Sequence, residues 1–229
     1  MRNVSALRLG LVCALAVPVP ATAQEMDVRD FVRQTFIHGV PYEEARRFGP
    51  AAVPALLAML EDRREQEHWT NVVGLLGMIG DARAVEPLIA FAAARTEETL
   101  SPAEYRAKST VPLALGYLLN GTANERALSY LIEGLNPSVW AQRGVTWRSP
   151  FHRTDVERNL QLTATAVLGL AVSARPEAAL ALRAVQSDTS AVGKQLQAQV
   201  GEVVSEALET HAQIARMGLV EYYRARRPN

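Results

Sequence analysis

One stretch of this sequence, from Val72 to Ala92, constrains the fold more than any other. It reads VVGLLGMIGDARAVEPLIAFA, and Gly80-Asp81 divides it into two apolar halves. Apolar residues recur at helical spacing in both halves: Val72, Leu75, Leu76 and Ile79, then Val85, Leu88, Ile89 and Ala92. The stretch therefore predicts two helices joined by a tight turn. Such a hairpin cannot bury both apolar faces alone, so it needs similar hairpins stacked beside it.

The chain contains further units of the same kind. Leu76-Gly77, Leu115-Gly116 and Leu168-Gly169 each lie late in a predicted first helix, and a turn and a second apolar helix follow each. Gly77 and Gly116 are 39 positions apart, close to the repeat length of helical solenoids, whereas Gly116 and Gly169 are 53 apart. Small residues at the matched position predict that neighbouring helices approach closely. The longer spacing predicts an insertion.

Capping signals locate the later helices. Three residues stand three positions before a glutamate, as in a capping box: Ser101 before Glu104, Thr122 before Glu125 and Thr154 before Glu157. Asn120-Gly121 is predicted to be a turn, and Asp81 is predicted to cap the second helix of the hairpin. The final segment, residues 190–227, is either one long helix or a pair. We expect a pair that breaks near Thr210 to His211.

The N-terminus has the pattern of a secretory signal. Arg2 and Arg8 form a basic region, Leu9 to Val17 is a short apolar core, and Ala21-Thr22-Ala23 is a small-x-small cleavage site. We expect residues 1–23 to be removed, which leaves 24–229 as one domain in the periplasm or secreted. Retention as an N-terminal anchor is the alternative. No later segment has the roughly 20 apolar residues that a membrane span needs.

Charge and motif content argue against several function classes. The 24 basic and 24 acidic side chains balance, whereas binding to nucleic acid requires a basic face. Neither a GxSxG nor an SxxK motif is present, and the only cysteine lies in the predicted leader. The four histidines lie in four separate segments, without an HExxH or paired-cysteine pattern. We therefore expect no catalytic residues, no metal and no cofactor.

The predicted insertion, Asn136 to Arg153, is the most unusual stretch. It reads NPSVWAQRGVTWRSPFHR and contains two of the three tryptophans but no acidic residue. Tryptophan and arginine concentrate in protein interfaces, so the candidate partner-binding residues are Trp140, Arg143, Trp147, Arg148, Phe151, His152 and Arg153. The alternative is a structural plug, in which the two indoles fold over the gap between repeats, as large aromatic side chains usually do.

The text GMIGDARAVEPLIAFA resembles the HEAT-like repeat found in bilin lyases and many bacterial scaffolding proteins. Gly80-Asp81, Ala84-Val85 and Pro87-Leu88-Ile89 match its usual Gly-Asp, Ala-Val and Pro-Leu core, and Gly49 to Leu57 resembles a looser copy. The resemblance implies an all-α fold, an α-solenoid of four to five antiparallel helix pairs that binds other proteins. It implies no particular catalyst, because such repeats serve many functions.

We therefore expect an exported, non-catalytic scaffold. It would bind a protein partner of unknown identity through the concave face of the solenoid and the insertion at 136–153. The alternative function is a bilin-lyase-like enzyme or a small-ligand carrier, which rests on the repeat resemblance alone.

Overall fold

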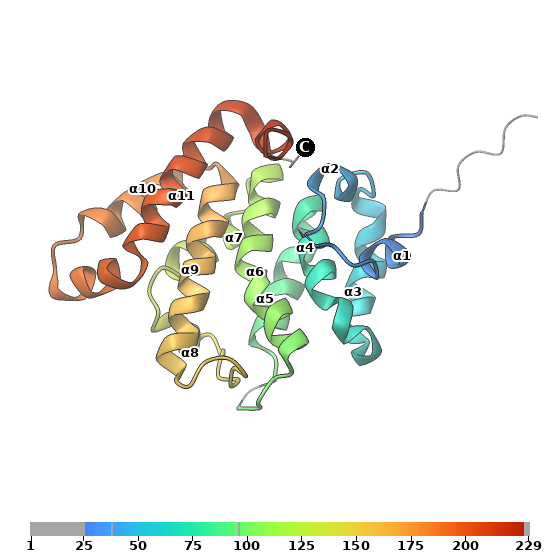
Figure 1. Ribbon diagram of the computed structural model, residues 1–229, viewed down its shortest axis with the longest axis horizontal. Coiled ribbons are helices and arrows are strands. Elements are labelled where there is room, and N and C mark those ends of the chain that lie inside the picture. Colours follow the sequence, from blue (N-terminus) through green and yellow to red (C-terminus); the bar gives the residue numbers. More distant parts are fainter. Residues whose placement is uncertain (1–25, 38, 96, 227–229) are drawn as a thin grey trace, which may run out of the picture.

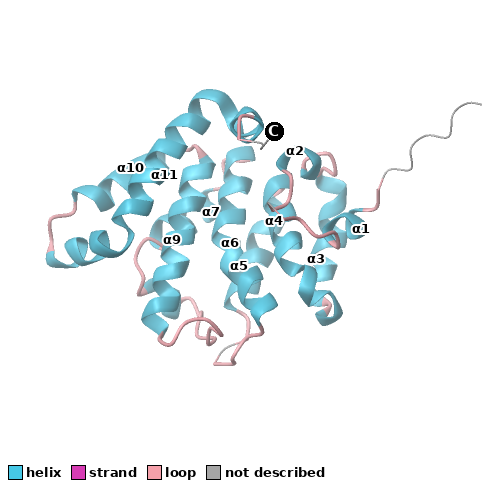
Figure 2. Ribbon diagram, viewed as in Figure 1, coloured by secondary structure: helices cyan, strands magenta, loops and turns pink. Residues whose placement is uncertain are grey.

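A computed structural model describes residues 26–37, 39–95 and 97–226, and the predicted signal peptide lies outside these residues. Within the described ranges the chain is helical and contains no β-strand, which confirms the all-α class (Figure 2). One isolated parallel bridge joins Thr99 to Arg148, and it ties the loop before α6 to the predicted insertion.

Eleven α-helices follow one another along the described residues. They are α1 (Val28–Val32), α2 (Tyr42–Ala45), α3 (Val53–Glu61), α4 (Trp69–Ile79), α5 (Val85–Ala93), α6 (Pro102–Gly121), α7 (Glu125–Glu133), α8 (Val139–Gln142), α9 (Asp155–Ser173), α10 (Pro176–Ser187) and α11 (Ala191–Arg224). Short 3₁₀ turns at Pro50–Ala52, Arg63–His68 and Ala82–Ala84 lead into α3, α4 and α5.

Four helices form the centre of the molecule. α4, α6, α9 and α11 pack against one another in chain order, and Figure 1 shows them as a row that ends with α11. The shorter α7 and α10 each contact the long helices on either side of them in the chain, and α5 contacts α6 and packs its Phe91 ring against Trp69 of α4. The largest apolar core is continuous from α1 to α11, since the buried residues of every helix in the row belong to one cluster.

The matched glycines lie where the central helices are closest. A Cβ atom added to Gly77 would overlap the backbone of Ala114 on α6. One added to Gly116 would overlap the backbone of Gly169 on α9, and one added to Gly169 would overlap Pro112. The predicted close approach is therefore confirmed at all three positions. Only a residue without a side chain allows the helix backbones to touch here.

The predicted caps are mostly confirmed. The carboxylate of Asp81 accepts the N–H of Arg83 at 2.9 Å and caps the turn that leads into α5. The Ser101 hydroxyl accepts the N–H of Glu104, and Thr154 with Glu157 forms a complete capping box. These three caps satisfy N–H groups that have no partner inside their own helix.

The predicted turn at Asn120-Gly121 and the capping box at Thr122 are wrong. α6 continues through Gly121, and the Thr122 hydroxyl donates back to the carbonyl of Leu118 at 3.0 Å. Asn124 caps α7 instead, because its side-chain oxygen accepts the N–H of Ala127. Asn and Thr both serve as caps, and the sequence spacing alone did not distinguish them.

The predicted pair of helices in the last segment is present, but the predicted break near Thr210 to His211 is in the wrong place. His211 is buried inside α11, and its Nε2 contacts the carbonyl oxygen of Arg175 at 2.8 Å. The chain bends at Gly218, where φ is 80° and ψ is 159°. Glycine adopts this conformation readily, whereas other residues almost never do. The bend turns the end of α11 back towards α2, near the C label in Figure 1.

Candidate binding surfaces

The two tryptophans of the insertion are buried and hold it against the core. Trp140 is 1% exposed and Trp147 is 0% exposed. Trp147 Nε1 donates to the carbonyl of Ala92 at 2.8 Å, and Trp140 Nε1 donates to the hydroxyl of Thr163 at 3.1 Å. Both indoles therefore act as the structural plug that was the alternative prediction. Neither is accessible to a partner in this conformation, which corrects their assignment as contact residues.

Two buried cations complete this attachment. Lys108 donates to the carbonyls of Phe91 and Ala94 at the C-terminal end of α5, beside the Ala92 carbonyl that Trp147 binds. Arg158 donates to the carbonyl of Trp147 at 2.7 Å and lies over its ring. The last carbonyls of a helix lack partners within it, so Lys108 and Trp147 close the end of α5, and Arg158 holds Trp147 in place.

Arg143 fixes the insertion to the end of α7. Its guanidinium donates to the carbonyl of Tyr130 at 2.8 Å and to the carboxylate of Glu133 at 2.6 Å. It also lies 4.1 Å from the centroid of the Tyr130 ring. Since only 15% of its side chain is exposed, Arg143 serves mainly to fix the insertion to α7.

The other four candidate residues form a surface that we call the loop tip: Arg148, Phe151, His152 and Arg153. Phe151 is 57% exposed, the two arginines are exposed and His152 is partly buried. The His152 Nδ1 atom contacts the hydroxyls of Ser149 at 2.9 Å and Tyr105 at 3.2 Å. The structure therefore brings together an exposed aromatic ring and two exposed cations on a segment that is anchored at its base.

The Ser149 hydroxyl stabilises the turn of this tip. It accepts the backbone N–H groups of Phe151 at 3.0 Å and His152 at 3.1 Å. Phe151 also packs edge-on against Tyr105, with the ring centroids 5.2 Å apart. These contacts position the loop tip before any partner arrives.

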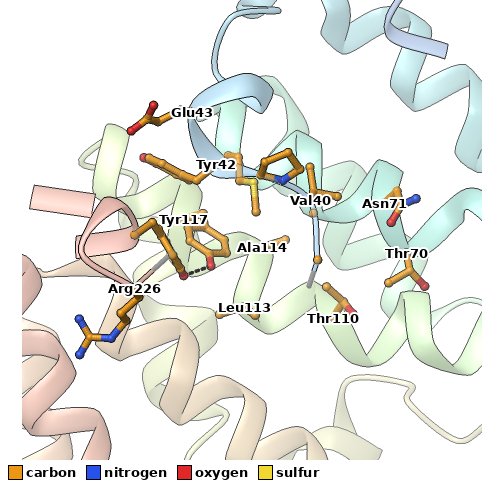
Figure 3. Close-up of a pocket in the computed structure, with 15 residues that line it drawn as sticks. Val40, Tyr42, Glu43, Thr70, Asn71, Thr110, Leu113, Ala114, Tyr117 and Arg226 are labelled. Atoms are coloured by element: carbon orange, nitrogen blue, oxygen red, sulfur yellow. Dashed lines mark hydrogen bonds between the residues drawn. The ribbon is translucent and has the colours of Figure 1, made fainter. Parts of the chain in front are cut away.

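A second surface, which sequence reasoning missed, is a cavity of about 380 Å³ between the two ends of the chain. We call it the tyrosine pocket, and Figure 3 shows it. Its walls come from the segment Gly39–Glu43, from α4, from α6 and from the end of α11. The residues that line it include Tyr42, Gly74, Met78, Leu113, Tyr117 and Tyr223.

Three tyrosine rings form one side of this pocket. The ring centroids of Tyr42 and Tyr117 are 5.8 Å apart, those of Tyr42 and Tyr223 are 5.6 Å apart, and those of Tyr117 and Tyr223 are 6.2 Å apart. The hydroxyls of Tyr117 and Tyr223 hydrogen-bond to each other. Burial raises the pKa of Tyr117 well above its ordinary value and also raises the pKa of Tyr223. Both phenols therefore stay protonated at neutral pH.

The charged residues at the rim are engaged elsewhere. Arg224 forms an ion pair with Glu43 at 3.0 Å. Arg226 donates to the side chain of Gln213 at 2.7 Å and stacks 3.9 Å from the centroid of the Tyr222 ring. At the opposite end, Thr70, Asn71 and Thr110 supply neutral polar groups (Figure 3). The walls of the pocket are thus largely apolar, with Glu43 and Arg226 at one end and neutral polar side chains at the other.

The tyrosine pocket was missed because its residues are far apart in the sequence. Tyr42 and Tyr223 lie near opposite ends of the chain, and only the bend at Gly218 brings them together. The signals were Gly218, nine residues before the predicted end of the last helix, and the adjacent Tyr222-Tyr223 pair, and neither of them indicates a contact by itself.

The described residues contain no group of three His, Cys, Asp or Glu side chains that could hold a metal ion. Within the same part of the chain, no helix has both the length and the apolar character needed to cross a membrane. No family model, no curated protein and no solved structure matches the sequence.

Proposed function

We propose that this protein is an exported, non-catalytic scaffold of HEAT-like repeats that binds a protein partner. The architecture is supported by the glycine contacts that join α4, α6 and α9, because repeated close packing at a matched position is expected of stacked helix pairs. Export is supported by the leader pattern of residues 1–23 alone.

The observation that carries the binding proposal is the loop tip. An exposed phenylalanine between exposed arginines resembles the centre of a protein interface, where aromatic and arginine side chains supply most of the affinity. The tip is held by buried anchors, so little conformational entropy is lost when a partner binds. Of the residues predicted to bind a partner, we retain Arg148, Phe151, His152 and Arg153.

Affinity capture tests this proposal with a variant that changes only the tip. We expect Arg148→Ala/Phe151→Ala/Arg153→Ala to abolish capture of the partner from native envelope extracts, as measured by quantitative mass spectrometry. Its melting temperature should stay within a few degrees of the parent protein, because these exposed side chains contribute little to folding. The control Leu180→Ala/Arg183→Ala/Lys194→Ala removes one exposed apolar residue and two exposed cations elsewhere. If both variants retain capture, the loop tip is not the binding surface.

The anchors should behave in the opposite way. Trp147→Ala removes a fully buried indole and leaves the Ala92 carbonyl without its donor, so we expect a loss of about 3–5 kcal/mol in the free energy of unfolding. Urea denaturation measures this loss. A Trp147→Ala variant of unchanged stability would mean that the insertion is not held by this residue.

A small-ligand carrier is the second candidate function, and the tyrosine pocket favours it. Its volume lies in the range of about 300–1,000 Å³ that is typical of ligand sites. Absorbance and native mass spectrometry of the protein purified from its source would detect a bound chromophore or other small molecule. If a small molecule is bound in stoichiometric amount, the protein is a carrier and not a plain scaffold.

A further inference from the structure

Gly74 is a buried glycine inside α4 that has open space where a side chain would lie. A Cβ atom added to Gly74 meets no other atom within 4 Å, whereas one added to Gly77, a single turn later on α4, overlaps the backbone of α6. Glycine inside a helix is destabilising relative to alanine. Helix packing requires the glycine at 77 but not the one at 74. The space that the missing side chain of Gly74 leaves belongs to the tyrosine pocket.

The pocket also retains one hydrogen-bond donor. Tyr117 and Tyr223 together carry two O–H groups, and their mutual hydrogen bond uses one of them. Among the described residues, neither hydroxyl has another hydrogen-bond partner. Both tyrosines line the cavity, and Figure 3 shows their hydrogen bond as a dashed line, so a ligand with an acceptor oxygen is favoured over a purely apolar one.

The apolar surface continues beyond the pocket onto α9. Leu113 lies one turn before Tyr117 on α6, and Leu168 lies one turn before Val172 on α9. Since Tyr117 and Val172 belong to one apolar cluster, Leu113 and Leu168 lie on the same face of the helix row. Leu168 is 42% exposed and so offers apolar surface on this face. A ligand that covers both regions has to be longer than the pocket.

We infer that the tyrosine pocket binds a large apolar side chain of an extended peptide segment. One backbone carbonyl of that segment accepts the free O–H of the Tyr117–Tyr223 pair, and a second apolar side chain covers Leu168. The side chain that enters the pocket is uncharged, because the walls around it are largely apolar. This inference rests on the proposed function, since it assigns a recognition element to the protein partner.

Methyl NMR of the full chain provides a local test. Met78 lines the pocket and Met59 is buried in the core, so their ¹³C-methyl signals form a probe and an internal control. The ligands are acetylated, amidated pentapeptides whose central residue is phenylalanine, leucine, alanine or glutamate, together with the small ketone benzylacetone. We expect the phenylalanine and leucine peptides to shift the Met78 signal but not the Met59 signal, with at least tenfold weaker binding of the alanine and glutamate peptides.

Three variants separate the pocket from a general effect on the fold. Gly74→Leu fills the open space and should abolish the Met78 shift without lowering the melting temperature, whereas Gly201→Leu on α11 should leave binding unchanged. Tyr117→Phe/Tyr223→Phe removes both hydroxyls of the pair and should weaken the phenylalanine peptide about fivefold. The control Tyr130→Phe removes a tyrosine hydroxyl on α7, outside the pocket, and should change binding less than twofold.

Each other result overturns the inference. If benzylacetone binds as tightly as the peptides, the pocket is a small-molecule site. If the glutamate peptide binds best, the assignment of an uncharged side chain is wrong. If no peptide shifts Met78, or if Gly74→Leu binds normally, the pocket does not recognise peptides. The scaffold proposal would survive these failures, because capture through the loop tip is measured independently.

Discussion

Glycine has two distinct uses in the central helices. Gly77, Gly116 and Gly169 lie where two helix backbones touch, whereas Gly74 and Gly201 have room for a side chain. The first group sets the spacing of the helix row. The second group can accept alanine, which loses less conformational entropy on folding. Substitution to alanine should therefore have opposite effects on the two groups.

The sharpest comparison is between Gly116→Ala and Gly201→Ala. The first places a methyl group against the Gly169 backbone, which cannot move aside as a flexible side chain would, so we expect a loss of about 3 kcal/mol in the free energy of unfolding. The second should raise stability by about 0.5–1 kcal/mol. Urea denaturation measures both changes. Equal effects of the two substitutions would contradict the close contact between α6 and α9.

Lys108 makes stability depend on pH. Its side chain is fully buried, and burial lowers its pKa to about 8 although Glu104 lies 3.8 Å away. The ordinary lysine pKa is about 10.4. Between these two values the unfolded chain binds more protons than the folded chain, so the free energy of unfolding rises with pH. The difference between the two pKa values corresponds to a gain of about 3 kcal/mol in the free energy of unfolding, and the full gain is reached only near pH 10.

Chemical denaturation at several pH values between 7.5 and 9.5 tests this effect. Stability should rise over this range in the parent protein and stay flat in Lys108→Met, which keeps the length of the side chain without its charge. The range ends below pH 10 because of the buried tyrosines. Burial raises the pKa of Tyr130 to about 12, so above about pH 10 this tyrosine loses its proton in the unfolded chain but not in the folded chain, and the free energy of unfolding falls. The same rise in Lys108→Met would show that another group is responsible.

At the scale of single elements, the insertion is a clamp on two helix ends. Trp147 and Lys108 satisfy the last carbonyls of α5, and Arg143 fixes the insertion to Tyr130 and Glu133 in the last turn of α7. An interface and a structural clamp use the same residue types, because both need large rings and several fixed donors. Composition could therefore identify this stretch as special but could not divide it into Trp140 and Trp147, which are buried, and the exposed loop tip.

Other elements were predictable to the extent that their determinants are local. The hairpin of α4 and α5, the caps at Ser101 and Thr154 and the matched glycines depend on residues within a few positions of each other. The tyrosine pocket depends on a contact between α6 and the end of α11, and no pattern of nearby residues in the sequence predicts a contact between such distant positions. The break in α11 was misplaced for a similar reason: His211 is polar, yet a carbonyl from a distant turn satisfies it.

Gly218 controls the position of the last element. Alanine there would be strained by its positive φ, at a cost of about 1–3 kcal/mol, although no atom blocks its side chain. We expect Gly218→Ala to release residues 219–226 from the tyrosine cluster while the rest of the fold stays intact. Trypsin should then cleave faster after Arg216 and Arg224. Gly201→Ala, in the regular part of α11, should be cleaved at the rate of the parent protein. If trypsin also cleaves Gly218→Ala at the parent rate, the glycine at the bend is not needed to hold the last element in place.

At the scale of the whole molecule, the segment Gly39–Glu43 and the end of α11 meet at one site. Arg224 pairs with Glu43, and Tyr223 contacts both Tyr42 and Tyr117. The end of α11 thus crosses back over the row of helices instead of continuing it. This return places the tyrosine pocket beside α4 and α6, away from the loop tip at the other end of these helices (Figure 1). A partner that used both surfaces would lie along the central helices.

Local stability should follow the position of each helix in this row. α6 and α9 have neighbours on both sides, whereas α1 has five residues and the turn between α10 and α11 is exposed. Opening an outer helix breaks fewer contacts than opening a central one, so its free energy of opening is lower. We expect amide hydrogen exchange to be slowest in α6 and α9, intermediate in α4 and fastest in α1 and around residues 187–195. Hydrogen exchange with mass spectrometry measures this order, and uniform exchange from α1 to α11 would mean that the chain opens as one cooperative unit.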